Sequence, residues 1–372
     1  MASGPHGRAG LHADLGWDPP RPVFSPCFSV GIRGHPWASF AALREIGPHW
    51  YGRCVVDPAR PEPAPQRRCP ACGGDDARAF ARGWDVEYRT TSQVFVYLQC
   101  AACETVFLFD PPRDRLAQIY PKTYYSFAGW NDSLVQRVKK WLDSRLFRQL
   151  VQQLPGARLA VLDVGGGNGW LLSLVREQDA RVAETHEVDL DESARPAAEA
   201  AGHVFHCQRI EDFSSDRRFD LVIMLNIIEH VADPGLVLRR VAGLLSEHGV
   251  VLIKTPNTDT LDRRLFQRHN WGGLHCPRHW VLFTAPGFLR LARQSGLEPV
   301  WLRYTQGAPQ WAASVLGWLA DRGWVSITAE RPMHRHPLHA PLLGLAAAAD
   351  FGRGPFMKTA QMFAVLRRAD HA

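Results

Sequence analysis

The stretch VLDVGGGNGWLL, residues 161–172, decides the fold of this 372-residue chain. A hydrophobic run ends in a cluster of glycines, and an amphipathic run typical of a helix follows. Glycine is needed where the backbone takes a positive φ, and where a ligand lies against bare main chain. The first turn of a helix offers unpaired N–H groups and a positive dipole. The stretch therefore predicts a strand, a ligand-binding turn and a helix.

Beyond residue 158 the chain alternates between strand-like and helix-like runs. Strands are expected at residues 159–164, 180–189, 203–207, 219–226, 250–257, 298–304 and 361–368, and helices at 169–178, 192–202, 233–249 and 285–296. Strict alternation of this kind predicts an α/β fold with a parallel, doubly wound, Rossmann-like sheet.

Composition narrows the class of protein and its partners. The chain is 46% hydrophobic and 22% charged, as in ordinary globular proteins, and its net charge is +6. The arginines that supply this charge are scattered, so no nucleic-acid partner is expected. The start lacks the apolar core of a secretory signal, and no run is long enough to span a bilayer. We therefore expect a cytoplasmic protein without a transmembrane segment.

Two Cys-x-x-Cys pairs stand near the N-terminus: Cys69 with Cys72, and Cys100 with Cys103. Thiols stay reduced in the cytosol, so such pairs indicate metal ligands or a redox motif before disulfides. A redox pair would need a helix N-terminus, and neither pair precedes a convincing helix. Four thiolates suit tetrahedral Zn²⁺ and leave no open position, which predicts a structural zinc site. Chance pairing and a disulfide remain the alternatives.

The glycine spacing separates two kinds of nucleotide ligand. A dinucleotide fingerprint needs Gly-x-Gly-x-x-Gly, whereas this chain has Gly165-x-Gly167-x-Gly169 with Asp163 before it. A second acid, Asp189, ends the next expected strand, where it can accept hydrogen bonds from ribose hydroxyls. The spacing disfavours an NAD-dependent enzyme. Together with the FD-hydrophobic strand and the EHV-x-DP turn downstream, it resembles the class I S-adenosylmethionine-dependent methyltransferases.

That resemblance implies roles for several residues. Asp189 would hold the ribose, Glu211 or Asp212 would lie beside the adenine, and Asn226 would line the floor of the pocket. Glu229 and His230 end the fourth expected strand, where open α/β sheets place their ligands. Glu229, His230 and His279 are candidate catalytic groups, the histidines because an imidazole titrates near neutral pH. A purely supporting role for both histidines remains the alternative.

The N-terminal thiols and the sequence YPKTYY, residues 120–125, resemble the zinc-bearing region of a subset of these methyltransferases. That subset acts on sugars, polysaccharide precursors and natural products, and in it a linker tyrosine reaches over donor or acceptor. Tyr124 or Tyr125 would match here, and Tyr125 is a further candidate catalytic residue.

We therefore expect methyl transfer to a small-molecule acceptor by in-line displacement, with S-adenosylmethionine as donor and Zn²⁺ as a structural ion. An RNA or protein methyltransferase with a zinc docking module, and a non-catalytic donor-binding scaffold, are the alternatives. The expected organisation is a Pro/Gly-rich, partly disordered arm (1–66), a zinc module (67–120), a linker helix (121–156), the donor-binding core (157–305), and an acceptor lid with the final strand (306–372).

Overall fold

A computed structural model of the chain describes residues 68–121, 124 and 134–369. The expected arm, residues 1–66, and one candidate site residue, Tyr125, lie outside these residues. Within the described part of the chain, no helix combines the length and the apolar character that crossing a membrane requires.

A seven-stranded sheet forms the centre of the molecule, in the order β10-β11-β8-β7-β4-β5-β6. β11 runs antiparallel to both of its neighbours, and the other strands run parallel to one another. The α/β fold with a mostly parallel central sheet is thus confirmed. The strands are β4 (Leu159–Val164), β5 (Val182–Asp189), β6 (Val204–Cys207), β7 (Phe219–Leu225), β8 (Leu245–Pro256), β10 (Leu297–Thr305) and β11 (Gln361–Arg368).

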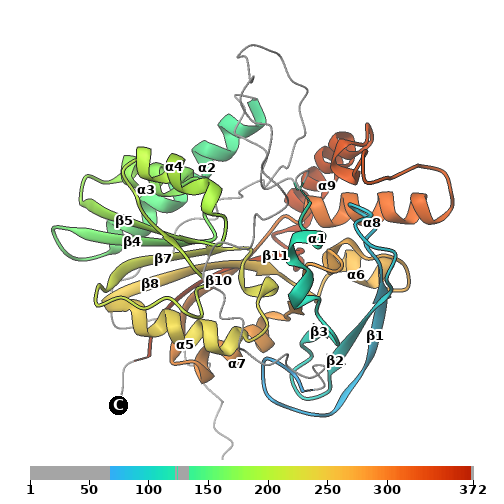
Figure 1. Cartoon of the computed structure of the whole chain (residues 1–372), viewed down its shortest axis with the longest axis horizontal. Coiled ribbons are helices and arrows are strands. Elements are labelled where there is room, and N and C mark those ends of the chain that lie inside the picture. The colour runs from blue at the N-terminus through green and yellow to red at the C-terminus, as the bar shows by residue number, and fades with distance from the viewer. Residues whose placement is uncertain (1–67, 122–123, 125–133, 370–372) are drawn as a thin grey trace, which may run out of the picture.

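Helices cover both faces of this sheet (Figure 1). Alternate residues of a strand point to opposite faces, so each central strand contributes to two apolar clusters. Val161 and Leu221 pack with α2 and α3, whereas Leu162 and Val222 pack with α5 and α7. The helices are α2 (Leu134–Gln153), α3 (Trp170–Gln178), α4 (Arg195–Ala200), α5 (Pro234–Leu244), α6 (Leu261–Phe266) and α7 (Ala285–Gln294).

One predicted boundary was wrong. The helix expected over residues 233–249 begins after Asp233, whose carboxylate accepts a hydrogen bond from the Leu236 N–H, but it ends at Leu244. β8 starts at Leu245, which pairs with Phe219 of β7. Leu245 is fully buried in that pairing, so burial in the sheet takes precedence over the helical periodicity of the segment.

A second, four-stranded sheet joins the N-terminal module to the core. Its order is β1-β2-β3-β9, and all its pairings are antiparallel. β1 (Ala77–Gly83), β2 (Phe95–Cys100) and β3 (Val106–Leu108) belong to the module, whereas β9 (Val281–Leu282) comes from the core. The short helix α1 (Leu116–Ile119) follows β3. The module therefore shares a sheet with the segment that carries His279.

Two further helices lie between β10 and β11 in the chain. α8 (Ala308–Asp321) and α9 (His339–Arg353) pack against each other beside the sheet (Figure 1). Their apolar contact is made mainly by alanine and leucine side chains, among them Ala308, Ala312, Leu343 and Ala347. This pair of helices occupies the stretch expected to form an acceptor lid.

Candidate functional site

The glycine turn between β4 and α3 has the geometry that its sequence predicts. Gly165, Gly167 and Gly169 have φ values of 75°, 65° and 73°, a region that residues with a Cβ rarely adopt. A Cβ on Gly167 would meet no atom within 4 Å. The Gly167 N–H donates a hydrogen bond of 3.0 Å to Oδ2 of Asp189, at the end of β5. The turn therefore presents an open surface next to the acid expected to bind a ribose.

Two more carboxyl groups lie behind this turn. Asp163 is 2% exposed and Glu187 is fully buried. The Gly166 N–H donates to Oε1 of Glu187 at 2.6 Å, whereas Oδ2 of Asp163 and Oε2 of Glu187 have no hydrogen-bond partner. Burial, reinforced by the neighbouring acids, raises the pKa of Asp163 to about 8 and that of Glu187 to about 11. At neutral pH this buried pair therefore holds a proton.

Glu187 is a residue that the sequence analysis missed. A signal was present, because Glu187 precedes Asp189 by two residues on one strand and therefore shares its face of the sheet. Asp189 itself accepts hydrogen bonds from the N–H groups of Gly167 and Asp191, and burial raises its pKa.

The other expected donor-side residues are spread over two loops. Glu211 is buried and accepts a hydrogen bond of 2.9 Å from Arg209, whereas Asp212 is exposed. Asn226 follows β7 with a φ of 58°, and its amide donates to Oε1 of Glu229 at 2.9 Å. The structure thus connects Asn226 to the expected catalytic group rather than directly to the glycine turn.

Glu229, His230 and His279 converge at the end of β7, although the last is 49 residues from His230 in the sequence. One potential ligand atom from each of the three lies within 4.8 Å of those of the others. The His230 and His279 rings are 4.9 Å apart between centroids. Desolvation lowers the pKa of His230 to about 3 and that of His279 well below 6.5, so both rings are neutral. Burial raises the pKa of Glu229 to about 7.

A ring of hydrogen-bonded groups surrounds these three residues. The Tyr120 hydroxyl lies 3.0 Å from Nδ1 of His230, and the Tyr124 hydroxyl lies 3.1 Å from Nε2 of His275. Nδ1 of His275 lies 2.7 Å from Oε1 of Glu87, a residue of the N-terminal module. These tyrosines come from the YPKTYY segment, so the structure brings Tyr120 and Tyr124 to the histidines. Nothing in the sequence identified Glu87 as a residue of this site.

A buried ion pair fixes the loop that carries His279. Arg278 and Asp85 are both fully buried, with guanidinium–carboxylate distances of 2.9 and 3.2 Å. The neighbouring guanidinium offsets the effect of burial and lowers the pKa of Asp85. Arg278 also donates to the carbonyl oxygen of Ile119 at 2.7 Å. The module, including its helix α1, and the core therefore meet at one charged contact beside the site.

The four module cysteines lie together as their spacing predicts. Sγ of Cys69 is 3.5 Å from Sγ of Cys103, and Sγ of Cys72 is 3.5 Å from Sγ of Cys100. All four sulfur atoms lie within 4.8 Å of one another. Zn–S bonds of ~2.3 Å in a tetrahedron separate sulfur atoms by ~3.8 Å, so this donor set fits a zinc ion.

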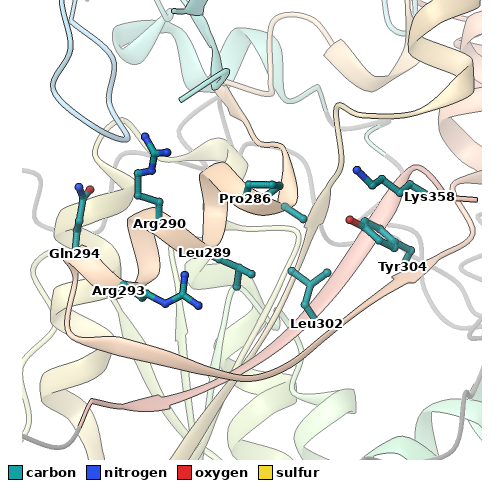
Figure 2. Close-up of a pocket in the computed structure, with 9 residues that line it drawn as sticks. Pro286, Leu289, Arg290, Arg293, Gln294, Leu302, Tyr304 and Lys358 are labelled. Carbon is teal, nitrogen blue, oxygen red and sulfur yellow. The ribbon is translucent and has the colours of Figure 1, made fainter. Parts of the chain in front are cut away.

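A groove of about 610 Å³ opens between α7 and the sheet, away from these residues (Figure 2). Leu289 and Leu302 form its apolar floor, and Arg290, Arg293 and Lys358 lie along its rim. Each of these cations has a partner: the Ala102 carbonyl, Glu298 and Asp259, respectively. None of the expected site residues lines the groove.

A sequence comparison identifies the core of the chain. Residues 137–302 match a family model described as a methyltransferase domain. The chain contains a class I methyltransferase domain. The expectations of an α/β methyltransferase fold and of this class of enzyme domain are thereby confirmed.

Curated relatives resemble only part of the chain. It is 31% identical over 107 residues to a ubiquinone biosynthesis O-methyltransferase of Bradyrhizobium diazoefficiens, covering 27% of this chain and 40% of the relative. It is 32% identical over 166 residues to a protein of the same name from Ruegeria pomeroyi, covering 41% of this chain and 65% of the relative. The chain thus spans less than two thirds of the length of either relative.

Solved structures align with the chain at low identity and with TM-scores below 0.5. A putative sarcosine dimethylglycine methyltransferase from Galdieria sulphuraria aligns with a TM-score of 0.45 and 15% identity, over 64% of this chain and 88% of its own. A coclaurine N-methyltransferase aligns with a TM-score of 0.44 and 14% identity, over 65% and 76% of the two chains.

Proposed function

We propose that this protein transfers a methyl group from S-adenosylmethionine to a small-molecule acceptor, such as a sugar, a polysaccharide precursor or a natural product. The observation that carries the proposal is the open glycine turn beside Asp189, which faces the same edge of the sheet as the histidine cluster. The ubiquinone biosynthesis names of the relatives also favour a small-molecule acceptor.

The residues around the glycine turn would hold the donor. The open side of Gly167 admits a ligand against the main chain, and Asp189 offers carboxylate oxygens to the ribose. Gly165 and Gly169 keep the turn in its positive-φ conformation. The donor supplies an electrophilic methyl group, and the contribution of the chain is to position it for in-line attack. We assign the adenine side to Glu211 and Asp212.

The acceptor would lie at Glu229, His230 and His279. A neutral imidazole with a free lone pair can interact with the hydrogen of an acceptor hydroxyl. We assign Tyr124, hydrogen-bonded to His275, to the acceptor side of the site, and α8 and α9 to the acceptor lid. The contact between α8 and the Gly272–Leu274 turn supports this assignment.

Changing Asp189 to Asn tests the donor site. Loss of a charged hydrogen-bond acceptor should weaken binding of S-adenosylhomocysteine by ~1–3 kcal/mol, which is ~5- to 150-fold in Kd. The matched control is Asp191→Asn, which alters a neighbouring acid that caps a short helical turn. Unchanged affinity of the Asp189 variant would remove the pocket assignment.

We further propose that the four module cysteines bind one structural Zn²⁺ ion. The convergence of their sulfur atoms supports the proposal. Metal analysis of the purified chain should find about one zinc ion for this site, and the double variant Cys69→Ser, Cys100→Ser should lose it. Cys276→Ser is the control, because Cys276 is a buried thiol outside the cluster. Zinc content unaffected by the double variant would show that the ligand set is wrong.

A further inference from the structure

Three side chains at the end of β7 bring potential metal ligands together without sulfur. Glu229, His230 and His279 each offer one such atom, and these atoms lie within 4.8 Å of one another. The three residues come from the turn after β7 and from the loop before β9, two segments that the fold holds side by side. The Trp280 N–H donates to the carbonyl oxygen of Glu229 at 2.7 Å and joins the two segments.

Hydrogen bonds to backbone carbonyls determine where each histidine carries its proton. Nδ1 of His230 lies 2.9 Å from the carbonyl oxygen of Arg278, and Nδ1 of His279 lies 2.8 Å from that of Gly273. A carbonyl oxygen only accepts hydrogen bonds, so each Nδ1 carries the hydrogen and each Nε2 carries a lone pair. Among the described residues, no hydrogen bond occupies Nε2 of either ring. Metal-binding histidines are commonly oriented in this way.

The carboxylate of Glu229 is oriented by equally specific contacts. Glu229 is fully buried, Oε1 accepts from Asn226 at 2.9 Å, and Oε2 accepts from Thr255 at 3.0 Å. Each oxygen keeps a further lone pair after these bonds. A buried carboxylate is costly unless a cation or strong hydrogen bonds compensate it.

We propose that Glu229, His230 and His279 bind a first-row divalent cation such as Mn²⁺, Fe²⁺, Co²⁺ or Zn²⁺. Two imidazole nitrogens and one carboxylate are a ligand set that such ions use with positions left open for water or substrate. His275 is excluded as a ligand, because its two ring nitrogens lie 2.7 Å from Glu87 and 3.1 Å from Tyr124. The chain would then hold two unlike metal centres, one thiolate-bound and closed, the other open.

The open positions give this centre a role in the proposed function. An acceptor that presents an oxygen atom to the cation is held next to the donor site, and its hydroxyl becomes more acidic. The cation and an acceptor proton compete for the same lone pair on His230. The structure favours the cation, since three donor atoms converge where proton transfer needs only one. This consequence rests on the proposed methyl transfer, whereas the binding of the cation does not.

Titration with Mn²⁺, followed by the EPR signal of the free ion, tests the site directly. Mn²⁺ is a poor match for four thiolates, so zinc-loaded protein as purified is suitable. The wild-type chain should bind one Mn²⁺, and Glu229→Gln and His279→Ala should each weaken that binding by at least ~10-fold. His248→Ala is the matched control, since this histidine is exposed near the start of β8. Circular dichroism identifies any variant that has not folded, and His279→Gln then replaces the alanine variant.

Two results would overturn the proposal: no Mn²⁺ bound by the wild type at millimolar concentration, or equal affinity in folded Glu229 and His279 variants. Binding of S-adenosylhomocysteine is measured on the same samples. Site-dependent Mn²⁺ binding without donor binding would refute the proposed function and leave the metal site standing. Donor binding without Mn²⁺ binding would refute the metal site and leave the proposed function standing.

Discussion

Replacing Glu187 by Gln should stabilise the protein, and more strongly as the pH rises. Glu187 is fully buried, and its Oε2 has no hydrogen-bond partner. Oδ2 of Asp163 is in the same state, and both oxygens lie within 2.4 Å of the point where a Cβ on Gly166 would stand. A glutamine keeps Oε1 for the Gly166 N–H and adds an N–H beside the Asp163 carboxyl. The substitution thus supplies a permanent N–H donor, whereas the wild-type pair has a donor only while it holds a proton.

The direction of the pH effect follows from the raised pKa values. An unfolded carboxyl group loses its proton near pH ~4, whereas the folded chain holds Asp163 to about 8 and Glu187 to about 11. Folded protein therefore binds more protons than unfolded protein above pH ~4, and stability falls as the pH rises through these folded pKa values. Removing the Glu187 carboxyl group removes the part of this fall in stability that Glu187 causes. One fewer unsatisfied buried group is worth ~1–3 kcal/mol in the free energy of unfolding.

Urea unfolding followed by tryptophan fluorescence at pH ~5 and pH ~8.5 measures this difference. The variant should match the wild type within ~0.5 kcal/mol at the lower pH and exceed it by ~1–3 kcal/mol at the higher pH. Glu247→Gln, at an exposed glutamate, is the control for the loss of a charge. A midpoint shift that is the same at both pH values, or a destabilised variant at pH ~8.5, would refute the reasoning.

Two further predictions concern the charged contact and the glycine turn. Arg278→Met should lower the free energy of unfolding by ~3–5 kcal/mol, because it leaves the buried Asp85 carboxylate without its guanidinium partner. Chemical denaturation measures this free energy, and a loss below ~1 kcal/mol would contradict the prediction. Gly165→Ala should destabilise the fold, since its Cβ would come within 2.3 Å of Ile227, whereas Gly167→Ala should remain folded and lose binding of S-adenosylhomocysteine. Thermal melts measure the stability of both variants, and calorimetry measures their donor binding. Donor binding retained by Gly167→Ala would contradict the open-turn assignment.

The sheet could be predicted because its strands are local features of the sequence. β4 and β7 are short, mostly apolar runs, and the glycine turn after β4 identifies the ligand-binding edge of the sheet. The end of α5 could not be predicted, because Leu245 suits a helix or a strand equally well. Only its pairing with Phe219 in the folded sheet decides between the two.

In the candidate site, too, local sequence patterns predict some of the residues that come together, and only the folded structure shows the others. The spacing of the glycines and of the cysteines, and the EH pair, are short-range patterns, and the structure brings each set together. The contact between Glu87 and His275 joins residues 188 positions apart, and the Arg278–Asp85 pair joins residues 193 apart. Nothing local to either partner indicates such contacts, because they arise from the sheet that β9 shares with the module.

Calorimetric titration with S-adenosylhomocysteine and, separately, with NAD tests the central claim most directly. The account predicts micromolar binding of S-adenosylhomocysteine and none of NAD, because the turn has the Gly-x-Gly-x-Gly spacing with Asp163 before it and Asp189 beside it. Binding of NAD alone, or of neither compound, would contradict the assignment of this turn as a methyl-donor site.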